Sequence, residues 1–256
     1  MKNKLLDLLS DKTPFAGITL MCGSTRVTEI LARSNFDFLM VDLQHGEFNK
    51  ASATDSVRAI AATGTVPLGR VADNAPGAIN DLLDAGVLGV VVPMINSRDD
   101  AERAVRAAFY APDGKRSKGG SAPIIFGDDY ATHANNQILL VVMIETQEAV
   151  QNAAEILAVP GVGMCLIGTS DLAYDMGCER NGPEIKQALA KVINAGRKAN
   201  VPVGTAIGEV SDIATVEELA PAFYLISHDQ GLLKKAGGDL SASLLKAMKR
   251  TTQSKA

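Results

Sequence analysis

Short runs of continuously apolar residues recur along the chain, separated by stretches in which apolar residues follow helical spacing. This alternation constrains the fold more than any other feature of the sequence. Several runs, such as Val90-Val91-Val92, have no polar residue at alternate positions, which is typical of parallel strands buried on both faces. We predict eight strands, at residues 17–22, 38–43, 66–71, 87–95, 138–144, 163–167, 201–207 and 223–226.

Predicted helices fill most of the intervals between these strands. One begins at Pro183, since Pro is favoured at the first helical position, and it carries Ile185 and Leu189 on its buried face. The other predicted helices lie at 2–9, 25–34, 75–85, 101–110, 146–158, 211–219 and 232–248.

The number of strand–helix units indicates the fold class. Eight units in 256 residues match the usual size of a (β/α)8 TIM barrel. A doubly wound sheet is the alternative, and it normally carries a GxGxxG phosphate turn after its first strand. Here that strand is followed by Gly23-Ser24-Thr25, without the motif. We therefore predict one barrel domain over residues 1–256.

Composition excludes several classes of protein. Hydrophobic residues make up 46% of the chain and charged residues 21%, which is typical of a globular protein. The net charge is −4 with no basic block, so we expect no nucleic-acid partner. No apolar run is long enough to cross a bilayer, and the charged first residues do not resemble a signal peptide. The three cysteines form no CxxC pair, so we expect a cytoplasmic protein.

The connection between Tyr110 and Asn136 is unusually long. Loops of this length are usually lids or contact segments, although a disordered surface loop is the alternative.

Polar residues follow four of the predicted strands directly. The catalytic groups of a barrel come from the C-terminal ends of its strands, so these residues are the candidates for chemistry. They are Asp42 to His45 after the second strand, Arg70 after the third, Glu145 after the fifth, and Gly168, Thr169, Ser170 and Asp171 after the sixth.

Glu145 and Asp171 follow consecutive strands, so their carboxylates can converge. Two carboxylates completed by water suit Mg²⁺ or Mn²⁺. The alternative is that each acid caps the helix that follows it. Arg70 offers bidentate recognition of a carboxylate or an enolate oxygen, or else an ion pair with Asp73. His45 is a candidate acid or base, or else a structural histidine.

Other catalytic motifs are missing. The chain has no P-loop, no GxSxG and no HExxH. The sixth strand is followed by no lysine, which argues against Schiff-base aldolase chemistry. We assign no role to His133 or His228.

Six short motifs occur in the order seen in one family. The chain resembles the HpcH/HpaI family of metal-dependent class II 2-oxo-acid aldolases, from about Leu5 to about Leu232. The motifs are Asp42-Leu43-Gln44-His45-Gly46, Gly69-Arg70-Val71, Leu83-Asp84-Ala85-Gly86, Val92-Pro93-Met94, Ile144-Glu145-Thr146 and Gly168-Thr169-Ser170-Asp171-Leu172.

This resemblance implies a barrel of the phosphoenolpyruvate/pyruvate type and assigns roles to the rim residues. Glu145 and Asp171 would bind a divalent metal, Mg²⁺ or Mn²⁺ with Co²⁺ as a third candidate. Arg70 would hold the pyruvate oxygen, and His45 would form a proton-transferring dyad with Asp84. The remaining substrate-binding residues would be Asp42, Gly168, Thr169 and Ser170.

The resemblance also implies a reaction and an assembly. The reaction cleaves a 4-hydroxy-2-oxo acid to pyruvate and an aldehyde. The assembly is a homo-oligomer, a hexamer in many members, in which a C-terminal helix at about 232–250 is exchanged between subunits. Met143 stands where many members carry Gln, two residues before the metal-binding Glu. The alternatives are a CoA-thioester lyase of the citryl or malyl type, and a non-catalytic barrel that binds oxo acids.

Overall fold

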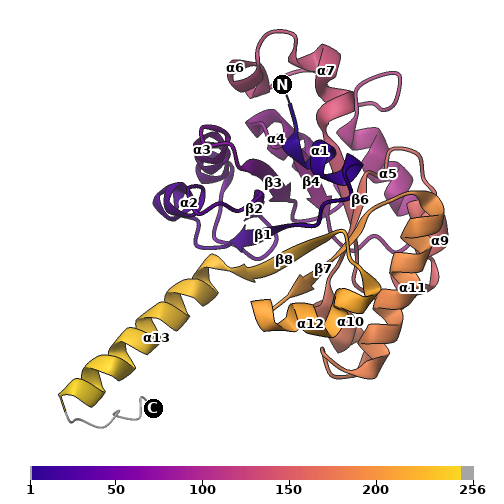
Figure 1. The fold of residues 1–256 in the computed structure, drawn as a ribbon. Helices are drawn as coiled ribbons and strands as arrows, with labels where there is room; N and C mark the ends of the chain where they lie inside the picture. The colour runs from indigo at the N-terminus through magenta and orange to yellow at the C-terminus, as the bar shows by residue number, and fades with distance from the viewer. Residues whose placement is uncertain (1, 249–256) are drawn as a thin grey trace.

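In the computed structural model, which describes residues 2–248, eight parallel strands close into a barrel in sequence order (Figure 1). Each strand pairs with the next, and β8 pairs with β1. The predicted (β/α)8 fold is therefore confirmed. The strands are β1 (Phe15–Leu20), β2 (Phe38–Asp42), β3 (Val66–Arg70), β4 (Gly89–Val92), β5 (Leu139–Ile144), β6 (Met164–Ile167), β7 (Val203–Ile207) and β8 (Phe223–His228).

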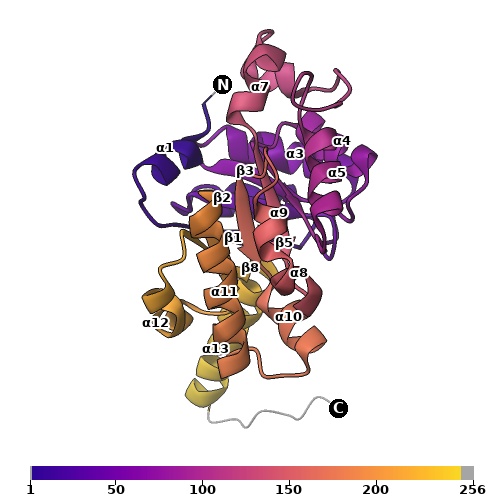
Figure 2. The same cartoon turned by 90° about the vertical axis from the view of Figure 1, so that its right-hand side faces the viewer.

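Helices surround the barrel, and α8, α9 and α11 lie along one side of it (Figure 2). The predicted helix at 146–158 is divided at Asn152 into α8 and α9. Helices α3, α6, α7 and α10 are absent from the predicted set. The helices are α1 (Lys4–Ser10), α2 (Thr25–Leu31), α3 (Lys50–Ala61), α4 (Pro76–Ala85), α5 (Arg98–Ala108), α6 (Ala122–Phe126), α7 (Tyr130–Gln137), α8 (Gln147–Gln151), α9 (Ala153–Leu157), α10 (Thr169–Met176), α11 (Pro183–Ala199), α12 (Ile213–Val216) and α13 (Asp229–Ala247), with 3-10 turns η1 (Val210–Asp212) and η2 (Glu217–Leu219).

Aromatic rings fill the N-terminal end of the barrel interior. Phe15, Phe38 and Phe223 pack together, with ring centroids 5.4 to 6.3 Å apart. Gly17 and Gly204 leave room for these rings, because a Cβ at either position would lie 2.5 Å from a phenylalanine ring atom. This end is therefore closed by side chains, and polar chemistry is left to the opposite end.

The amino-terminal segment and the long connection lie at the closed end of the barrel (Figure 1). The Asn3 amide donates hydrogen bonds to the carbonyls of Leu88 and Gln137, at 3.0 and 2.8 Å. The connection between α5 and β5 contains α6 and α7, and Arg116 anchors it. The Arg116 side chain is fully buried, lies over the Tyr110 and Tyr130 rings, and pairs with Asp84 at 2.8 Å. The connection is therefore an ordered segment, and it does not cover the rim of its own barrel.

The last helix leaves the barrel at the rim and points away from it (Figures 1 and 2). The Asp229 carboxylate accepts hydrogen bonds from the N–H groups of Met21 and Cys22, which fixes the start of α13 beside β1. Four leucines of α13 are exposed, namely Leu232, Leu233, Leu240 and Leu244. Positions 249–250 of the predicted helix lie outside the described residues. No helix within residues 2–248 is long and apolar enough to span a membrane.

Candidate active site

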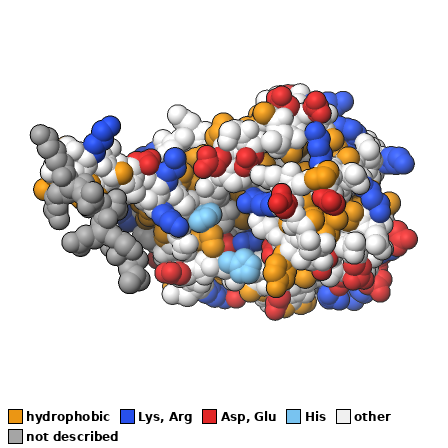
Figure 3. Space-filling view, turned by 90° about the horizontal axis from the view of Figure 1, so that it is seen from below, with side chains coloured by type: hydrophobic (Ala, Val, Ile, Leu, Met, Phe, Trp, Pro, Cys, Tyr) orange, Lys and Arg blue, Asp and Glu red, His pale blue; other side chains and the backbone are white. Residues whose placement is uncertain are grey.

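A cavity of about 400 Å³ opens at the C-terminal ends of the strands. We call it the central cavity. Figure 3 looks onto this end of the molecule, where histidine side chains lie close to basic and acidic ones. Seven of the predicted site residues line the cavity or close it from below. Those in its lining are His45, Arg70, Gly168, Thr169, Ser170 and Asp171, and Asp42 lies behind Arg70.

Asp42 and Arg70 form a buried bidentate ion pair on adjacent strands. Arg70 Nε donates to Asp42 Oδ1 at 2.9 Å, and Nη2 donates to Oδ2 at 2.6 Å. The register places these residues opposite each other at the ends of β2 and β3. Asp42 is fully buried, so it supports Arg70 instead of lining the cavity. Within residues 2–248, Arg70 Nη1 has no hydrogen-bond partner, which leaves it for a ligand.

Asp42 also fixes the turn that carries His45. Its Oδ1 accepts the N–H groups of Gln44 at 3.0 Å and His45 at 3.4 Å. The His45 side chain is exposed and lines the central cavity. The same carboxylate thus positions both the guanidinium and the imidazole.

Glu145 is buried at the end of β5, and only one of its two carboxylate oxygens has a hydrogen-bond partner. Its Oε1 accepts the Met94 N–H at 2.7 Å, whereas Oε2 has no hydrogen-bond partner among the described residues. Burial raises the pKa of Glu145, and the Met94 hydrogen bond opposes that rise. The negative charge of Asp171 raises this pKa further, and Arg70 lowers it. The two carboxylates are therefore close enough to interact electrostatically.

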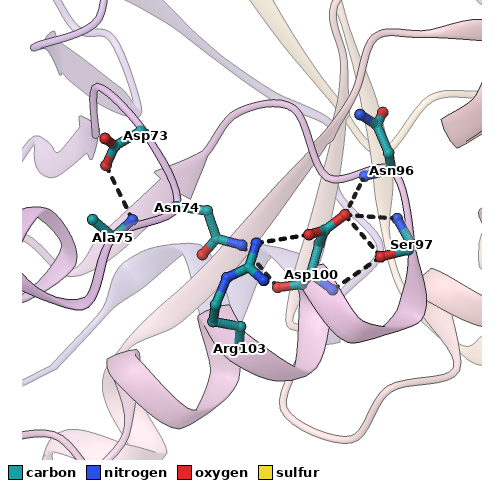
Figure 4. Close-up of polar contacts among 7 residues, drawn as sticks. All are labelled: Asp73, Asn74, Ala75, Asn96, Ser97, Asp100 and Arg103. Atoms are coloured by element: carbon teal, nitrogen blue, oxygen red, sulfur yellow. Dashed lines mark hydrogen bonds and ion pairs between the residues drawn. The ribbon is translucent and has the colours of Figure 1, made fainter.

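The Met94 N–H belongs to the loop after β4, and Asp100 organises the next part of this loop (Figure 4). Asp100 Oδ2 accepts hydrogen bonds from the N–H groups of Asn96 and Ser97 and from the Ser97 hydroxyl. The hydroxyl of Thr146, the residue after Glu145, donates to Asn96 Oδ1 at 2.6 Å. This network ties the loop to the end of β5, and Met94 itself adopts a left-handed conformation with φ +54°.

Helix α10 begins at the rim directly after β6. The first N–H groups of an α-helix have no intrahelical partner, so the amides from Thr169 to Asp171 are available to an anion. The Gly168 N–H instead donates to the Ile144 carbonyl. The Thr169 hydroxyl donates to the Ala206 carbonyl at 2.9 Å, so its side chain is also occupied. Ser170 and Asp171 are exposed at the cavity.

Asp84 lies at the opposite end of the barrel from His45. It is in the last turn of α4, which leads to the N-terminal end of β4, and it pairs there with Arg116. The predicted His45–Asp84 dyad therefore does not form within one chain. The physical reason is topological, because a helix that follows a strand returns the chain to the other end of the barrel.

The residues at the ends of β5 and β6 fit a divalent metal ion. The unpartnered Oε2 of Glu145 is a hard oxygen donor, and the nearby Asp171 supplies a second carboxylate. A Cβ at Gly168 would lie 2.7 Å from Glu145 Oε2, so glycine keeps that oxygen accessible. No cluster of three or more metal-ligating side chains occurs in the described part of the chain. Water and substrate oxygens would complete the coordination, as is usual for Mg²⁺.

The sequence gives no role to several residues at this rim. The Met94 N–H is a backbone donor, so no side-chain pattern announces it. Met143, Arg180 and His228 line the central cavity, and Met143 is otherwise buried. His228 comes two residues after the predicted strand at 223–226, and this nearness to a strand end is the signal that could have found it. Its Nδ1 accepts the Gly231 N–H at 3.1 Å and caps α13.

Comparisons with known proteins show the family to which the chain belongs. Residues 20–235 match the model of a family described as HpcH/HpaI aldolase/citrate lyase. A 4-hydroxy-2-oxo-heptane-1,7-dioate aldolase of Shigella flexneri is 34% identical over 248 residues, which cover 94% of this chain and 93% of that protein.

Solved structures show the same likeness. An HpcH/HpaI aldolase/citrate lyase family protein from Burkholderia cenocepacia J2315 has a TM-score of 0.89 at 30% identity, covering 95% of this chain and 99% of that one. A citrate synthase has a TM-score of 0.84 at 25% identity, covering 96% and 97%. The chain belongs to the HpcH/HpaI aldolase/citrate lyase family.

Proposed function

We propose that this protein is a metal-dependent class II aldolase that cleaves a 4-hydroxy-2-oxo acid to pyruvate and an aldehyde. One observation carries the proposal. Arg70, whose Nη1 has no partner among the described residues, lines the central cavity, and the unpartnered Oε2 of the buried Glu145 lies directly behind Gly168 in the cavity wall. A divalent metal ion together with a 2-oxo acid would complete both, because Glu145 needs a cation and Arg70 needs an acceptor oxygen. The 34% identity to an aldolase over most of the chain supports the same reaction.

Glu145 and Asp171 would hold the metal, which is Mg²⁺ or Mn²⁺, with Co²⁺ as a third candidate. When bound, the metal acts as a Lewis acid that polarises the 2-oxo group. The free Nη1 of Arg70 binds the oxygen that becomes the enolate, so the developing negative charge meets a fixed positive charge. The amides of Thr169, Ser170 and Asp171 at the start of α10 receive the substrate carboxylate.

The cleavage balances as a proton transfer and a bond fission. A base removes the proton from the C4 hydroxyl, the C4–O bond becomes the aldehyde carbonyl, and the C3–C4 electron pair becomes the pyruvate enolate. A proton added to C3 then gives the pyruvate methyl group. We assign the proton transfers to His45, because imidazole exchanges protons near neutral pH. The Nδ1 of His228 is already engaged by Gly231.

We also propose a cytoplasmic homo-oligomer, with six chains as the expected number. The exposed leucines of α13 support an exchanged helix, because within residues 2–248 they are left uncovered on a helix that points away from the barrel. The three free cysteines fit a reducing compartment. If Asp84 assists His45, it must come from another copy of the chain. Light scattering on the intact chain measures the number of subunits.

Deuterium exchange into the methyl group of pyruvate, followed by NMR, tests the function without a guess about the aldehyde. We expect exchange with Mg²⁺ or Mn²⁺, none above background with chelator, and a loss of at least roughly 100-fold in Arg70→Ala. Arg70→Lys keeps a positive charge beside Asp42 and controls for folding, but it lacks the forked geometry. Exchange that is equal with metal and with chelator would contradict the proposal.

A CoA-thioester lyase on the same scaffold is the second candidate. The family description includes citrate lyase, and a citrate synthase has the same fold at 25% identity. Cleavage that requires a CoA thioester and ignores free 4-hydroxy-2-oxo acids would favour this candidate. Binding of oxo acids with neither exchange nor cleavage would indicate a non-catalytic barrel.

A further inference from the structure

A second cavity lies next to the central cavity, behind β7. It has a volume of about 250 Å³ and is enclosed by β7, α11, α12 and the loop that precedes α11. We call it the side cavity. The two cavities share Thr169, Arg180, Ala206 and Ile207 in their linings. Arg180 therefore stands in the wall between them.

Arg180 is held by one edge of its guanidinium only. Its Nε donates to Thr169 Oγ1 at 3.1 Å, and Thr169 in turn donates to the Ala206 carbonyl. Thr169 is buried, so the anchor is a fixed one. Across residues 2–248, Nη1 and Nη2 of Arg180 form neither a hydrogen bond nor an ion pair. A guanidinium fixed by Nε offers its remaining edge to an anion in a defined direction.

The side cavity contains a buried polar group that also lacks a partner. Thr205 lines this cavity, its side chain is fully buried, and its hydroxyl has no hydrogen-bond partner in the described structure. Buried hydroxyls are nearly always paired with protein, water or ligand. The side cavity therefore suits a polar occupant, and Thr205 is an observation independent of Arg180.

The two other charged side chains around the side cavity, Asp212 and Lys186, each have a partner, although Asp212 uses only its Oδ2. The Asp212 carboxylate accepts the N–H groups of Gly208 and Glu209, at 3.1 and 3.0 Å. Lys186 lies 3.4 Å from Glu218 at the surface. Among the residues that line the side cavity, Arg180 is thus the positive charge that remains available to an anion.

We propose that Arg180 binds an anionic group, a carboxylate or a phosphate, on the aldehyde half of the substrate. This inference rests on the proposed function, which places the 2-oxo acid half between Arg70 and Glu145. The aldehyde half then extends toward the wall of the central cavity that contains Arg180. The side cavity gives the distal group room, and its oxygens or an accompanying water satisfy the Thr205 hydroxyl. Arg180 is thereby a specificity-determining residue for the acceptor.

Aldol addition of pyruvate to paired aldehydes tests this assignment. Butanal and 4-oxobutanoate have the same number of carbons, but only the second carries a charge. Glyceraldehyde and glyceraldehyde 3-phosphate form the equivalent pair for phosphate. In Arg180→Gln we expect kcat/KM for at least one anionic aldehyde to fall roughly 10- to 100-fold, chiefly through KM. Its neutral counterpart should change by less than about twofold, and Arg180→Lys should retain part of the selectivity.

Controls separate this inference from the proposed function. Arg26→Gln removes an arginine from α2, where it pairs with Glu29 at the surface, and should leave the selectivity unchanged. Methyl exchange of pyruvate in Arg180→Gln should match the wild-type protein, which also shows that the variant is folded. Exchange retained with unchanged selectivity, or equal losses for charged and neutral aldehydes, overturns the role of Arg180 alone. Absence of metal-dependent exchange in the wild-type protein overturns both proposals.

Discussion

The two sides of the rim differ in how completely their buried carboxylates are paired. At the ends of β2 and β3, both carboxylate oxygens of Asp42 are paired with Arg70. At the end of β5, Glu145 is equally buried but has one oxygen paired and one without a partner. A buried charge is costly unless it is compensated. The first side is complete in the free protein, whereas the second leaves one carboxylate oxygen for a further partner, which we propose is a metal cation.

This difference assigns a structural role to the Asp42–Arg70 pair and a metal-binding role to Glu145 in the proposed mechanism. The Asp42–Arg70 pair is built at folding, so its loss should be measured mainly as a loss of stability. Glu145 is held ready by a backbone N–H, so its loss should be measured mainly as a loss of metal binding. The three experiments below test this separation.

Breaking the complete pair should have the largest effect. We expect Asp42→Ala to lower the free energy of unfolding by about 3–5 kcal/mol, because Arg70 is left nearly buried without its partner. Urea denaturation measures the change. Asp81→Ala removes an exposed partner of Lys50 and should cost under about 1 kcal/mol. Similar costs for the two variants would remove the distinction between the two sides of the rim.

Neutralising Glu145 should cost little stability but should remove most of the stabilisation by metal. Without metal, we expect Glu145→Gln to unfold within about 1 kcal/mol of wild type, since a buried uncompensated charge is removed. At a metal concentration of 100 times Kd, wild type should gain about 2.7 kcal/mol, and Glu145→Gln should gain little of this. Glu155→Gln, on the exposed surface of α9, should respond as wild type does. Equal stabilisation of all three proteins would place the metal elsewhere.

Removing the charge of Asp100, which supports the Met94 loop, should have the smallest effect on the free energy of unfolding. This effect should depend on pH. Burial acts to raise the pKa of Asp100, but hydrogen bonds from Ser97 and Asn96 and the charge of Arg103 lower it overall. The stability it adds is therefore full above the unfolded pKa of about 3.9 and is lost as pH falls through the lower folded pKa. We expect Asp100→Asn to cost about 1 kcal/mol at pH 7.

The matched measurement for Asp100→Asn is a pair of thermal unfolding series against pH. The gap between wild type and variant should narrow as the solution becomes more acidic. A gap that stays constant down to the acid end would show that the charge of Asp100 is not what holds the loop.

The strands were predictable because each is a local apolar run, and the predicted and observed strands overlap in all eight cases. The rim positions of Arg70, Glu145 and Asp171 followed, since the end of a strand is also a local property. The Met94 N–H was not predictable, because its position depends on a network that joins the loop after β4 to the end of β5. The alternative ion pair of Arg70 with Asp73 is not formed, and Asp73 instead accepts the Ala75 N–H.

For Asp84, the family resemblance and the barrel topology give different positions within one chain. The predicted helix at 75–85 already placed it just before the next strand, at the far end of the barrel. The motif placed it beside His45, and a motif carries no information about which end of a barrel a residue occupies. The leucines of α13 did not reveal its direction, because exposed leucines in a sequence look the same as buried ones, and only the family resemblance implied a helix that leaves its own barrel.

The anchoring of the amino-terminal segment by Asn3 has a practical consequence for handling the protein as a biocatalyst. Asn3 fixes this segment to the closed end of the barrel, and Lys2 beside it is exposed. A resin or an electrode coupled through this end would leave the opposite, reactive face directed to the solution. Immobilised material should therefore keep its turnover when attached by the amino terminus.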